Sequence, residues 1–148
     1  MKDFAKAINE RLGTKITSGR PSYAFKEAYS KVMTTNLKLL EIIKKLRANY
    51  KIAVISNAIK LGQKIVKARN LWTNFDVSIV SCEVGMIKPE KEIFELALRK
   101  LTFPAEECIF IDDREEHLEM PTQMGFKVVH FKTNQQLIED LKKFGVEV

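Results

Sequence analysis

The stretch CIFIDDREEH, residues 108–117, joins a short apolar run to two adjacent aspartates, Asp112 and Asp113. The apolar run predicts a buried strand, and the aspartates come where that strand ends. Adjacent carboxylates repel each other, and a role in capping a helix would explain only one of them. A divalent cation relieves such repulsion, because hard carboxylate oxygens suit Mg²⁺. We therefore expect a metal site at the end of a buried strand.

Apolar runs and helical patterns alternate on both sides of this stretch. Further strands are predicted by KIAVIS (residues 51–56), FDVSIVS (75–81) and KVVHF (127–131). Apolar residues at helical spacing predict helices from about residue 36, over 59–68, over 88–101, in a short segment that ends near 124, and from a cap at Thr133 or Asn134 to about 144. This order predicts an α/β fold, with a Rossmann-like parallel sheet and helices on both faces.

The first 35 residues have a different pattern. Helical spacing covers residues 3–12 and about 22–33, and no strand is predicted between them. The pattern changes near residue 35. We therefore expect an all-helical segment over residues 1–35 and an α/β unit over residues 36–148.

Composition limits the class of protein. The chain has 148 residues, 45% of them hydrophobic and 30% charged, which suits a single folded core. No apolar run approaches the roughly 20 residues of a membrane helix, and the first residues lack the apolar segment of a signal peptide. Cys82 and Cys108 lie among apolar residues, so we interpret them as core thiols and not as a disulfide or a metal pair. We expect a cytoplasmic protein with no membrane partner.

The charge balance is moderately basic, with 25 basic and 19 acidic residues and a net charge of +6. The lysines are spread along the predicted helices and do not form one block. This spread favours solvated helix faces over a nucleic-acid-binding surface. A positive field would still attract an anionic substrate.

Polar residues follow three of the predicted strands. Ser56 and Asn57 end the first, Lys88 comes before a helix that Pro89 would begin after the second, and the aspartate pair ends the third. In open α/β sheets, ligands bind outside the carboxyl ends of the strands. Taken singly, these residues have simpler interpretations as a turn, a surface lysine and helix caps. The ordered set predicts that a hydroxyl, an ammonium and two carboxylates meet in one crevice.

Four segments, taken in order, carry a family resemblance: VISN (54–57), GMIKPEKEIFELAL (85–98), CIFIDD (108–113) and MGFKVVHF (124–131). Together they resemble the haloacid dehalogenase-like (HAD) superfamily, and most closely its phosphatases with a helical cap. The resemblance is strong over about residues 36–131, and residues 1–35 resemble the final helices of such a cap. It implies Mg²⁺-dependent hydrolysis of a small phosphorylated metabolite, in which an aspartate first accepts the phosphoryl group.

The resemblance also implies roles for single residues. Ser56 would hydrogen-bond the transferring phosphoryl group, with the Asn57 amide nearby. Lys88 would neutralise the charge of the phosphoryl group and of the nucleophile. Asp113 would be the regular Mg²⁺ ligand, and Asp112 a supporting one.

The sequence departs from the family at the nucleophile. The family places it in an Asp-x-Asp motif at the end of a central first strand, between the strands that end in Ser56 and in Asp112. This chain has no Asp-x-Asp: its remaining aspartates are Asp3, which begins a predicted helix, Asp76, which opens a strand, and Asp140. Without the central strand, two interior sheet edges would lose their backbone partners.

Three accounts of this departure are open. The chain is a fragment of a longer phosphatase or has a misassigned start, which we favour; or its remaining strands close the gap; or another chain, such as a second copy in a homodimer, covers the exposed edges. We expect no phosphatase turnover from this polypeptide alone. The alternative function is a non-catalytic module that binds phosphate or a partner protein, although such a module would not need Ser56, Lys88 and both aspartates.

Two smaller departures concern the segment after the aspartates. His117 stands where this branch usually has asparagine, and we expect a half-exposed helix residue without a chemical role. Pro121 would interrupt a helix, so we expect a break, with Pro121 near the first turn of the second part. Trp72 and Phe75 are interpreted as core or loop packing.

Overall fold

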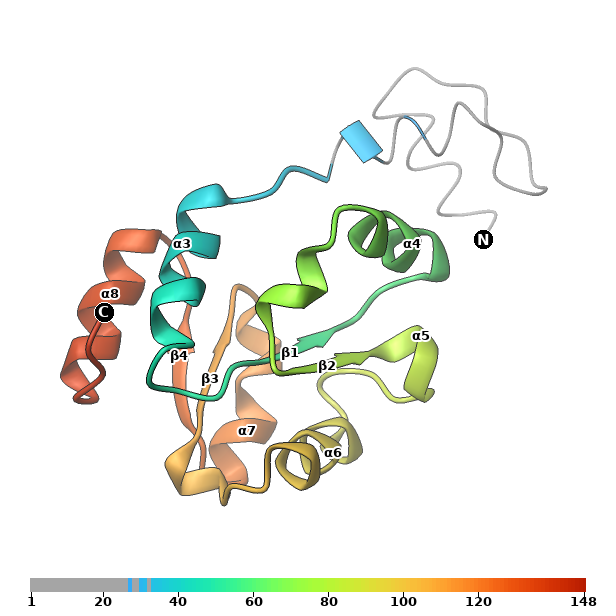
Figure 1. Ribbon diagram of the computed structural model, residues 1–148. Coiled ribbons are helices and arrows are strands. Elements are labelled where there is room, and N and C mark those ends of the chain that lie inside the picture. Colours follow the sequence, from blue (N-terminus) through green and yellow to red (C-terminus); the bar gives the residue numbers. More distant parts are fainter. Residues whose placement is uncertain (1–26, 28–29, 32) are drawn as a thin grey trace. The chain divides into compact units, whose positions relative to one another are not determined.

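The computed structural model describes residues 27, 30–31 and 33–148 (Figure 1). The chain divides into two compact units, Met1–Thr35 and Asn36–Val148. Residues 27, 30 and 31 are helical, within the helix expected over about 22–33, whereas the helix expected over 3–12 lies outside the described residues. All the described strands, and the motifs at their ends, belong to the second unit.

The second unit alternates helices and strands in the predicted order. Its elements are α3 (Leu37–Leu46), β1 (Ala53–Ser56), α4 (Lys60–Ala68), η1 (Leu71–Asn74), β2 (Val77–Val80), α5 (Ser81–Val84), α6 (Lys91–Leu101), η2 (Ala105–Glu107), β3 (Ile109–Asp112), η3 (Glu115–His117), α7 (Glu119–Gln123), β4 (Lys127–His130) and α8 (Asn134–Lys143). The four predicted strands are present, and each is shorter than predicted at one or both ends. The short 3₁₀ turns and α5 were not predicted.

Side-chain caps begin two of the helices. The side-chain oxygen Oδ1 of Asn36 accepts a hydrogen bond from Leu39 N at 3.0 Å, which caps α3. Thr133 and Gln136 form a reciprocal capping box at the start of α8, which confirms the predicted cap. Asn36 and Asn134 also exchange side-chain hydrogen bonds of 2.9 and 3.1 Å. This exchange fixes the first turns of α3 and α8 against each other.

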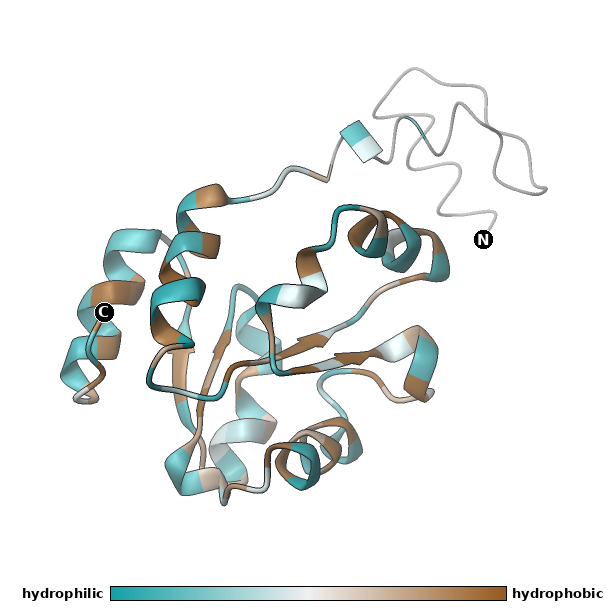
Figure 2. Cartoon of the chain, in the orientation of Figure 1, coloured by the Kyte–Doolittle hydropathy of each residue, from teal (hydrophilic) through white to brown (hydrophobic). Residues whose placement is uncertain are grey.

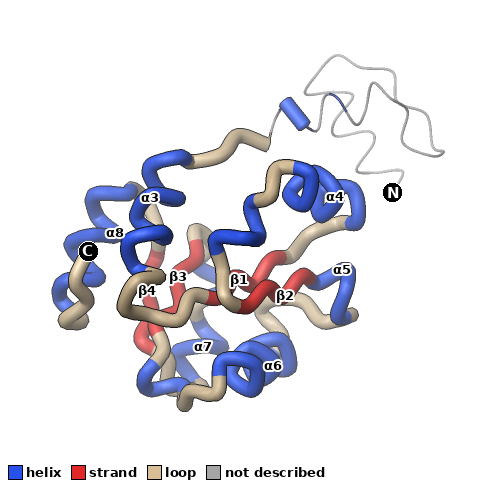
Figure 3. Tube along the Cα trace, in the orientation of Figure 1, coloured by secondary structure: helices blue, strands red, loops and turns tan. Residues whose placement is uncertain are grey.

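The strands form two separate parallel pairs (Figure 3). The register runs from Ala53 opposite Val77 to Ser56 opposite Val80 in β1–β2, and from Ile109 opposite Lys127 to Asp112 opposite His130 in β3–β4. Among residues 33–148, β1 and β3 form no hydrogen-bonded ladder. The account in which the remaining strands close the gap is therefore wrong for this structure.

One core joins both strand pairs. Ile79 of β2 and Phe110 of β3 pack around Ile93 and Phe94 of α6, and Phe126 belongs to the same cluster. The three phenylalanine rings meet edge to face, with centroids 5.2–6.5 Å apart. Helix α6 therefore covers the same face of both pairs.

A second core covers the other face of β3–β4. Ile42 and Leu46 of α3 and Leu137 and Leu141 of α8 surround Val129 of β4. Because side chains alternate along a strand, Phe110 enters the first core while its neighbour Ile109 packs against the second. Figure 2 shows the strands as apolar ribbons between helices with teal outer faces. Helices on both faces of a parallel sheet were predicted, and this α/β architecture is confirmed.

Asp76 fixes the starts of β1 and β2. Its carboxylate accepts hydrogen bonds from Arg47 at 3.0 Å and from Ile52 N at 2.9 Å, and Asp76 N donates to Ile52 O. The backbone bond from Ile52 and the bond from Arg47 hold the pKa of Asp76 below its ordinary value. Asp76 thus has a structural role before β2, as its position in the sequence indicates.

The segment after β3 breaks as predicted. η3 ends at His117, α7 begins at Glu119, and Pro121 is buried in the first turn of α7. A proline is tolerated there, because the first amides of a helix have no partner within the helix.

The two cysteines are free thiols, and both are half-buried. Cys108 packs against the first core. Burial, helped by the charges of Glu107 and Glu106, raises the pKa of the Cys108 thiol. A protonated thiol of this kind is unreactive, which agrees with its interpretation as a core thiol.

Candidate active site

The carboxyl ends of β1 and β3 meet at Lys88. Asn57, directly after β1, donates to Lys88 O at 2.9 Å and accepts from Lys88 N at 2.8 Å. The Lys88 ammonium reaches Asp112, the last residue of β3, at 2.5 Å. Of the hydroxyl, ammonium and two carboxylates that were predicted to meet, the structure brings Lys88 and Asp112 into contact, and Asn57 holds the backbone of Lys88.

The loop that carries Lys88 is longer than predicted. Helix α6 begins at Lys91, not at Pro89. Residues 87–90 form a turn closed by a hydrogen bond from Glu90 N to Ile87 O, and the Lys88–Pro89 peptide is cis. Lys88 thus lies in a turn, and the side chain of Asn57, the residue directly after β1, holds the Lys88 backbone in place.

Asp112 is a buried carboxylate held by three donors. In addition to Lys88, it accepts from Arg114 N at 3.0 Å and from His117 Nδ1 at 2.9 Å. Burial opposes its ionisation, but the bonds from Lys88 and Arg114, the charge of Lys88 and the bond from His117 outweigh burial and lower its pKa. Asp112 is therefore an anion whose two oxygens both have protein partners.

His117 corrects the sequence-based expectation. It was expected to be half-exposed and without a role, but only 5% of its surface is accessible and it binds Asp112. An ionised carboxylate can only accept, so Nδ1 carries the proton that it donates. The expectation placed His117 on an α-helix, whereas it ends the 3₁₀ turn η3 and its ring contacts Asp112 at the end of β3.

Asp113 differs sharply from its neighbour. It is exposed, and its carbonyl accepts a hydrogen bond from His130 Nε2 at 3.1 Å. The adjacent aspartates therefore have separate tasks. Asp112 is buried and accepts hydrogen bonds from protein groups, whereas Asp113 is exposed at the carboxyl end of β3.

The side chains present do not complete a Mg²⁺ site. Within the described part of the chain, no three His, Cys, Asp or Glu side chains gather so that they could hold a metal ion. Asp112 already has protein donors on both oxygens, which leaves Asp113 as the available carboxylate. A magnesium ion here would need oxygen ligands in addition to those of Asp112 and Asp113.

Ser56 and Ser81 stand at the ends of the paired strands β1 and β2. Ser56 is half-buried and lies opposite Val80. The buried Ser81 hydroxyl accepts from Ala58 N at 3.0 Å and contacts Ala58 O at 3.3 Å, so it fixes the chain just after Asn57. Sequence reasoning missed Ser81, although its place after an apolar strand matches that of Ser56.

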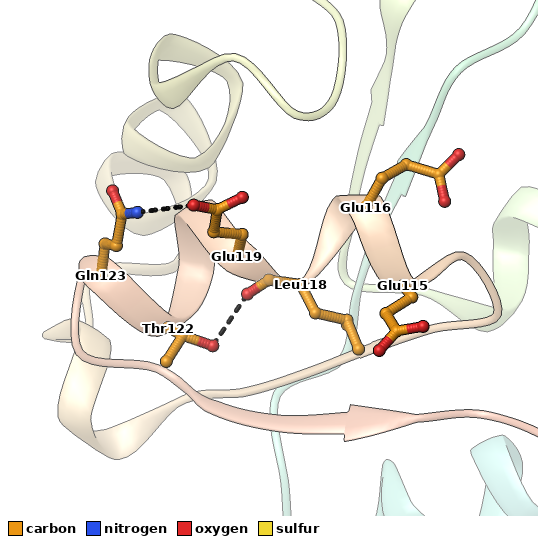
Figure 4. A pocket seen from close by; sticks show the side chains of 6 residues that line it. All are labelled: Glu115, Glu116, Leu118, Glu119, Thr122 and Gln123. Carbon is orange, nitrogen blue, oxygen red and sulfur yellow. Dashed lines mark hydrogen bonds between the residues drawn. The ribbon is translucent and has the colours of Figure 1, made fainter.

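A hollow beside η3 and α7 is not part of this site (Figure 4). It is lined by Glu115, Glu116, Leu118, Glu119, Thr122 and Gln123. Its carboxylates would repel a phosphate, and none of the strand-end residues lines it. Glu116 is paired with Arg114 and Glu119 accepts from Gln123, so two of these acids already have partners.

The sequence profile of the haloacid dehalogenase-like hydrolases matches residues 5–125. The chain belongs to this family. Pyrimidine 5'-nucleotidase YjjG of Escherichia coli (strain K12) is 31% identical over 96 residues, which are 64% of this HAD-like chain and 42% of that protein. Bifunctional epoxide hydrolase 2 of Rattus norvegicus is 34% identical over 73 residues, which are 49% of this chain and 13% of the rat protein. The chain thus spans less than half the length of either relative.

Solved structures show the same fold. HAD family enzyme bt-2542 of Bacteroides thetaiotaomicron matches with a TM-score of 0.73 and 22% identity, over 95% of this chain and 71% of that one. A HAD-like family hydrolase of Porphyromonas gingivalis matches with a TM-score of 0.73 and 20% identity, over 99% and 74%. The bt-2542 enzyme has also been solved with magnesium and inorganic phosphate. These matches confirm the Rossmann-like HAD fold of the chain.

No described helix combines the length and the apolar character needed to cross a membrane.

Proposed function

We propose that this chain contributes the phosphate-binding residues of a HAD-type phosphate-monoester hydrolase. By itself it does not hydrolyse phosphate esters. The observation that carries the proposal is the hydrogen-bonded chain from Asn57 through Lys88 to Asp112 at the carboxyl ends of β1 and β3. Phosphate complexes of bt-2542 and the nucleotidase name of YjjG support phosphate esters as the ligand class. A small phosphorylated metabolite is the proposed substrate.

Lys88 is the proposed phosphate-binding cation. An ammonium has three donors, and Asp112 occupies one of them, so two remain for phosphoryl oxygens. The Lys88 side chain is only 10% exposed, which strengthens its attraction for an anion. Asp112 holds the ammonium in place, and Asn57 holds the backbone that carries it.

Ser56 is the proposed second phosphate ligand. It ends β1 beside Asn57, where its hydroxyl can donate to a phosphoryl oxygen. We assign Asp113 as the proposed metal-facing carboxylate, because it is exposed at the end of β3. The sequence holds no Asp-x-Asp, so the phosphoryl acceptor of the family reaction has no counterpart among these residues.

Orthophosphate binding tests the site without requiring catalysis. Calorimetric titration of the full chain should show binding that Ser56→Ala weakens about tenfold, the effect of one charge-assisted hydrogen bond. Ser78→Ala is the matched control, since Ser78 is an exposed serine on the neighbouring strand β2. Equal binding by the Ser56 and Ser78 variants would contradict the proposed phosphate site.

Turnover is tested separately. The purified chain should not hydrolyse p-nitrophenyl phosphate in the presence of Mg²⁺. Mg²⁺-dependent hydrolysis that Asp113→Ala abolishes would overturn the inactivity of the chain alone. Phosphate binding without hydrolysis under any condition would favour the alternative, a phosphate-binding module.

A further inference from the structure

One oxygen of Asp112 is fully used by protein donors. Its Oδ1 accepts hydrogen bonds from Arg114 N at 3.0 Å and from His117 Nδ1 at 2.9 Å. A carboxylate oxygen has two lone pairs, and these two donors occupy both of them. Oδ1 of Asp112 therefore has no lone pair left for a metal ion.

The other oxygen of Asp112 is bound to Lys88. Oδ2 accepts from the Lys88 ammonium at 2.5 Å, and the Asp112 side chain is only 5% exposed. Mg²⁺ binds its oxygen ligands at about 2.1 Å, so an ion on Oδ2 would lie close to the ammonium, and the two cations would repel each other. Bound Mg²⁺ also keeps several of its waters, which a carboxylate this deeply buried does not accommodate. Oδ2 is thus no better placed than Oδ1 to hold the metal.

Asp113 is left as a single carboxylate. It is exposed, and its backbone carbonyl accepts from His130 Nε2 at 3.1 Å. In the part of the chain that the structure describes, no three His, Cys, Asp or Glu side chains gather around a metal position. Mg²⁺ loses its waters reluctantly, so one exposed carboxylate holds it weakly. The carboxylates at the end of β3 therefore do not fit a tightly bound magnesium ion.

His117 fixes the direction in which Asp112 points. Its ring is 5% exposed and lies at the end of η3, and Nδ1 donates to Oδ1 of Asp112. Because His117 and Arg114 N hold one oxygen, the other faces Lys88. Asp112 is thus held from one side by the turn after β3, and it holds the Lys88 ammonium from the other.

We propose that the Lys88 site binds phosphate groups as free anions, without Mg²⁺, and that Asp112 and His117 position the Lys88 ammonium. This role rests on the proposed function, because it concerns the same phosphate site. Asp112 occupies one of the three ammonium donors, so the other two supply the positive charge and the hydrogen bonds that a metal ion would otherwise give to the phosphate. The ligands are orthophosphate and phosphate monoesters, and not their magnesium complexes.

Calorimetry with and without the metal tests the proposal on one protein. Orthophosphate is titrated into the full chain, once with EDTA and once with a millimolar excess of Mg²⁺, with the ionic strength matched by NaCl. The two dissociation constants should agree within about threefold. Binding that appears only with Mg²⁺, or a larger gain in its presence, would overturn the metal-free site and leave the phosphate-binding function standing. An absence of binding under both conditions would overturn both.

Asp113→Asn tests whether a metal ion bridges this carboxylate to the phosphate. Without a bridging metal, loss of a negative charge near the site should leave the affinity for orthophosphate unchanged or raise it, in EDTA and in Mg²⁺ alike. Glu139→Gln removes a charge from an exposed residue of α8 and is the control. A loss of affinity in Asp113→Asn that occurs in Mg²⁺ and is absent from Glu139→Gln would contradict the proposal.

The positioning role of His117 needs a reading of Lys88 itself. Nitrogen NMR of the lysine ammonium groups should show Lys88 shifting on addition of orthophosphate in EDTA, and not on addition of Mg²⁺ alone. His117→Ala should broaden this signal and weaken orthophosphate binding about tenfold, because Asp112 loses a donor that fixes it. His117→Asn retains a side-chain N–H and should restore part of both. Parent affinity and an unchanged Lys88 signal in His117→Ala would remove His117 from this role.

Discussion

The ammonium of Lys88 lies 2.5 Å from Asp112 Oδ2, and the two side chains are 10% and 5% exposed. This ion pair joins the turn after α5 to the end of β3, and so links the two strand pairs at their carboxyl ends. Lys88 also lies 5.7 Å from the centroid of the Phe110 ring. Lys88 is thus both a structural link between the halves of the sheet and the proposed phosphate ligand.

Removal of one partner of this buried pair should be strongly destabilising. Lys88→Met leaves the Asp112 carboxylate buried with less compensation, and we expect a loss of about 3–5 kcal/mol in unfolding free energy. Urea denaturation of the variant measures this loss. Lys91→Met, which breaks an exposed ion pair with Glu95, is the control and should cost below about 0.5 kcal/mol.

A double variant shows whether that loss comes from the pair. Lys88→Met combined with Asp112→Leu removes both charges, and we expect it to be more stable than Lys88→Met alone. Additive losses from the two substitutions would show that the pair is not coupled.

The lowered pKa of Asp112 predicts an acid-sensitive contribution to stability. The unfolded chain protonates this carboxyl at a higher pH than the folded chain does, so the contribution is complete above the ordinary pKa of about 4. It is lost as the pH falls from there through the lower folded-state pKa. The melting temperature of Asp112→Asn should therefore approach that of the parent chain as the pH is lowered below about 4. If the difference in melting temperature between Asp112→Asn and the parent chain instead widens as the pH falls below about 4, the ionised form of Asp112 does not stabilise the fold.

His117 should stabilise the site through its bond to Asp112. His117→Ala removes a buried donor to a charged acceptor, and we expect a loss of about 1–3 kcal/mol in unfolding free energy. His117→Asn retains a side-chain N–H and should recover part of that loss. If Asn is no better than Ala, the contribution of His117 comes from packing and not from the hydrogen bond.

Asp76 should stabilise the fold without affecting phosphate binding. Asp76→Ala leaves Ile52 N and Arg47 without their acceptor, and we expect a loss of about 1–2 kcal/mol in unfolding free energy. The affinity for orthophosphate, measured by calorimetry, should stay within twofold or so of the parent value. A large loss of affinity would show that the strand starts and the site are coupled.

Local sequence signals predicted most of the fold. Apolar runs gave the four strands, Thr133 gave the cap of α8, and Pro121 gave the break before α7. These features depend on nearby residues, which is why they can be read from sequence. The start of α6 was placed too early, because the turn over residues 87–90 depends on contacts with Asn57, far away in the chain.

The site was predicted in outline and missed in detail. The rule that ligands bind at strand ends predicted that Lys88 and Asp112 lie together, and the structure shows their ion pair. The burial of His117 could not be predicted, because it depends on how the chain turns after Asp113. The unequal roles of Asp112 and Asp113 follow from the direction of each side chain at the end of β3. Residue types alone do not give that direction.

Hydrolysis and phosphate binding by the purified chain together test the central claim most directly. With p-nitrophenyl phosphate and Mg²⁺ we predict no hydrolysis by the full chain, although the same protein binds orthophosphate with an affinity that Ser56→Ala weakens about tenfold and Ser78→Ala leaves unchanged. Mg²⁺-dependent hydrolysis by the chain that Asp113→Ala abolishes would contradict the claim.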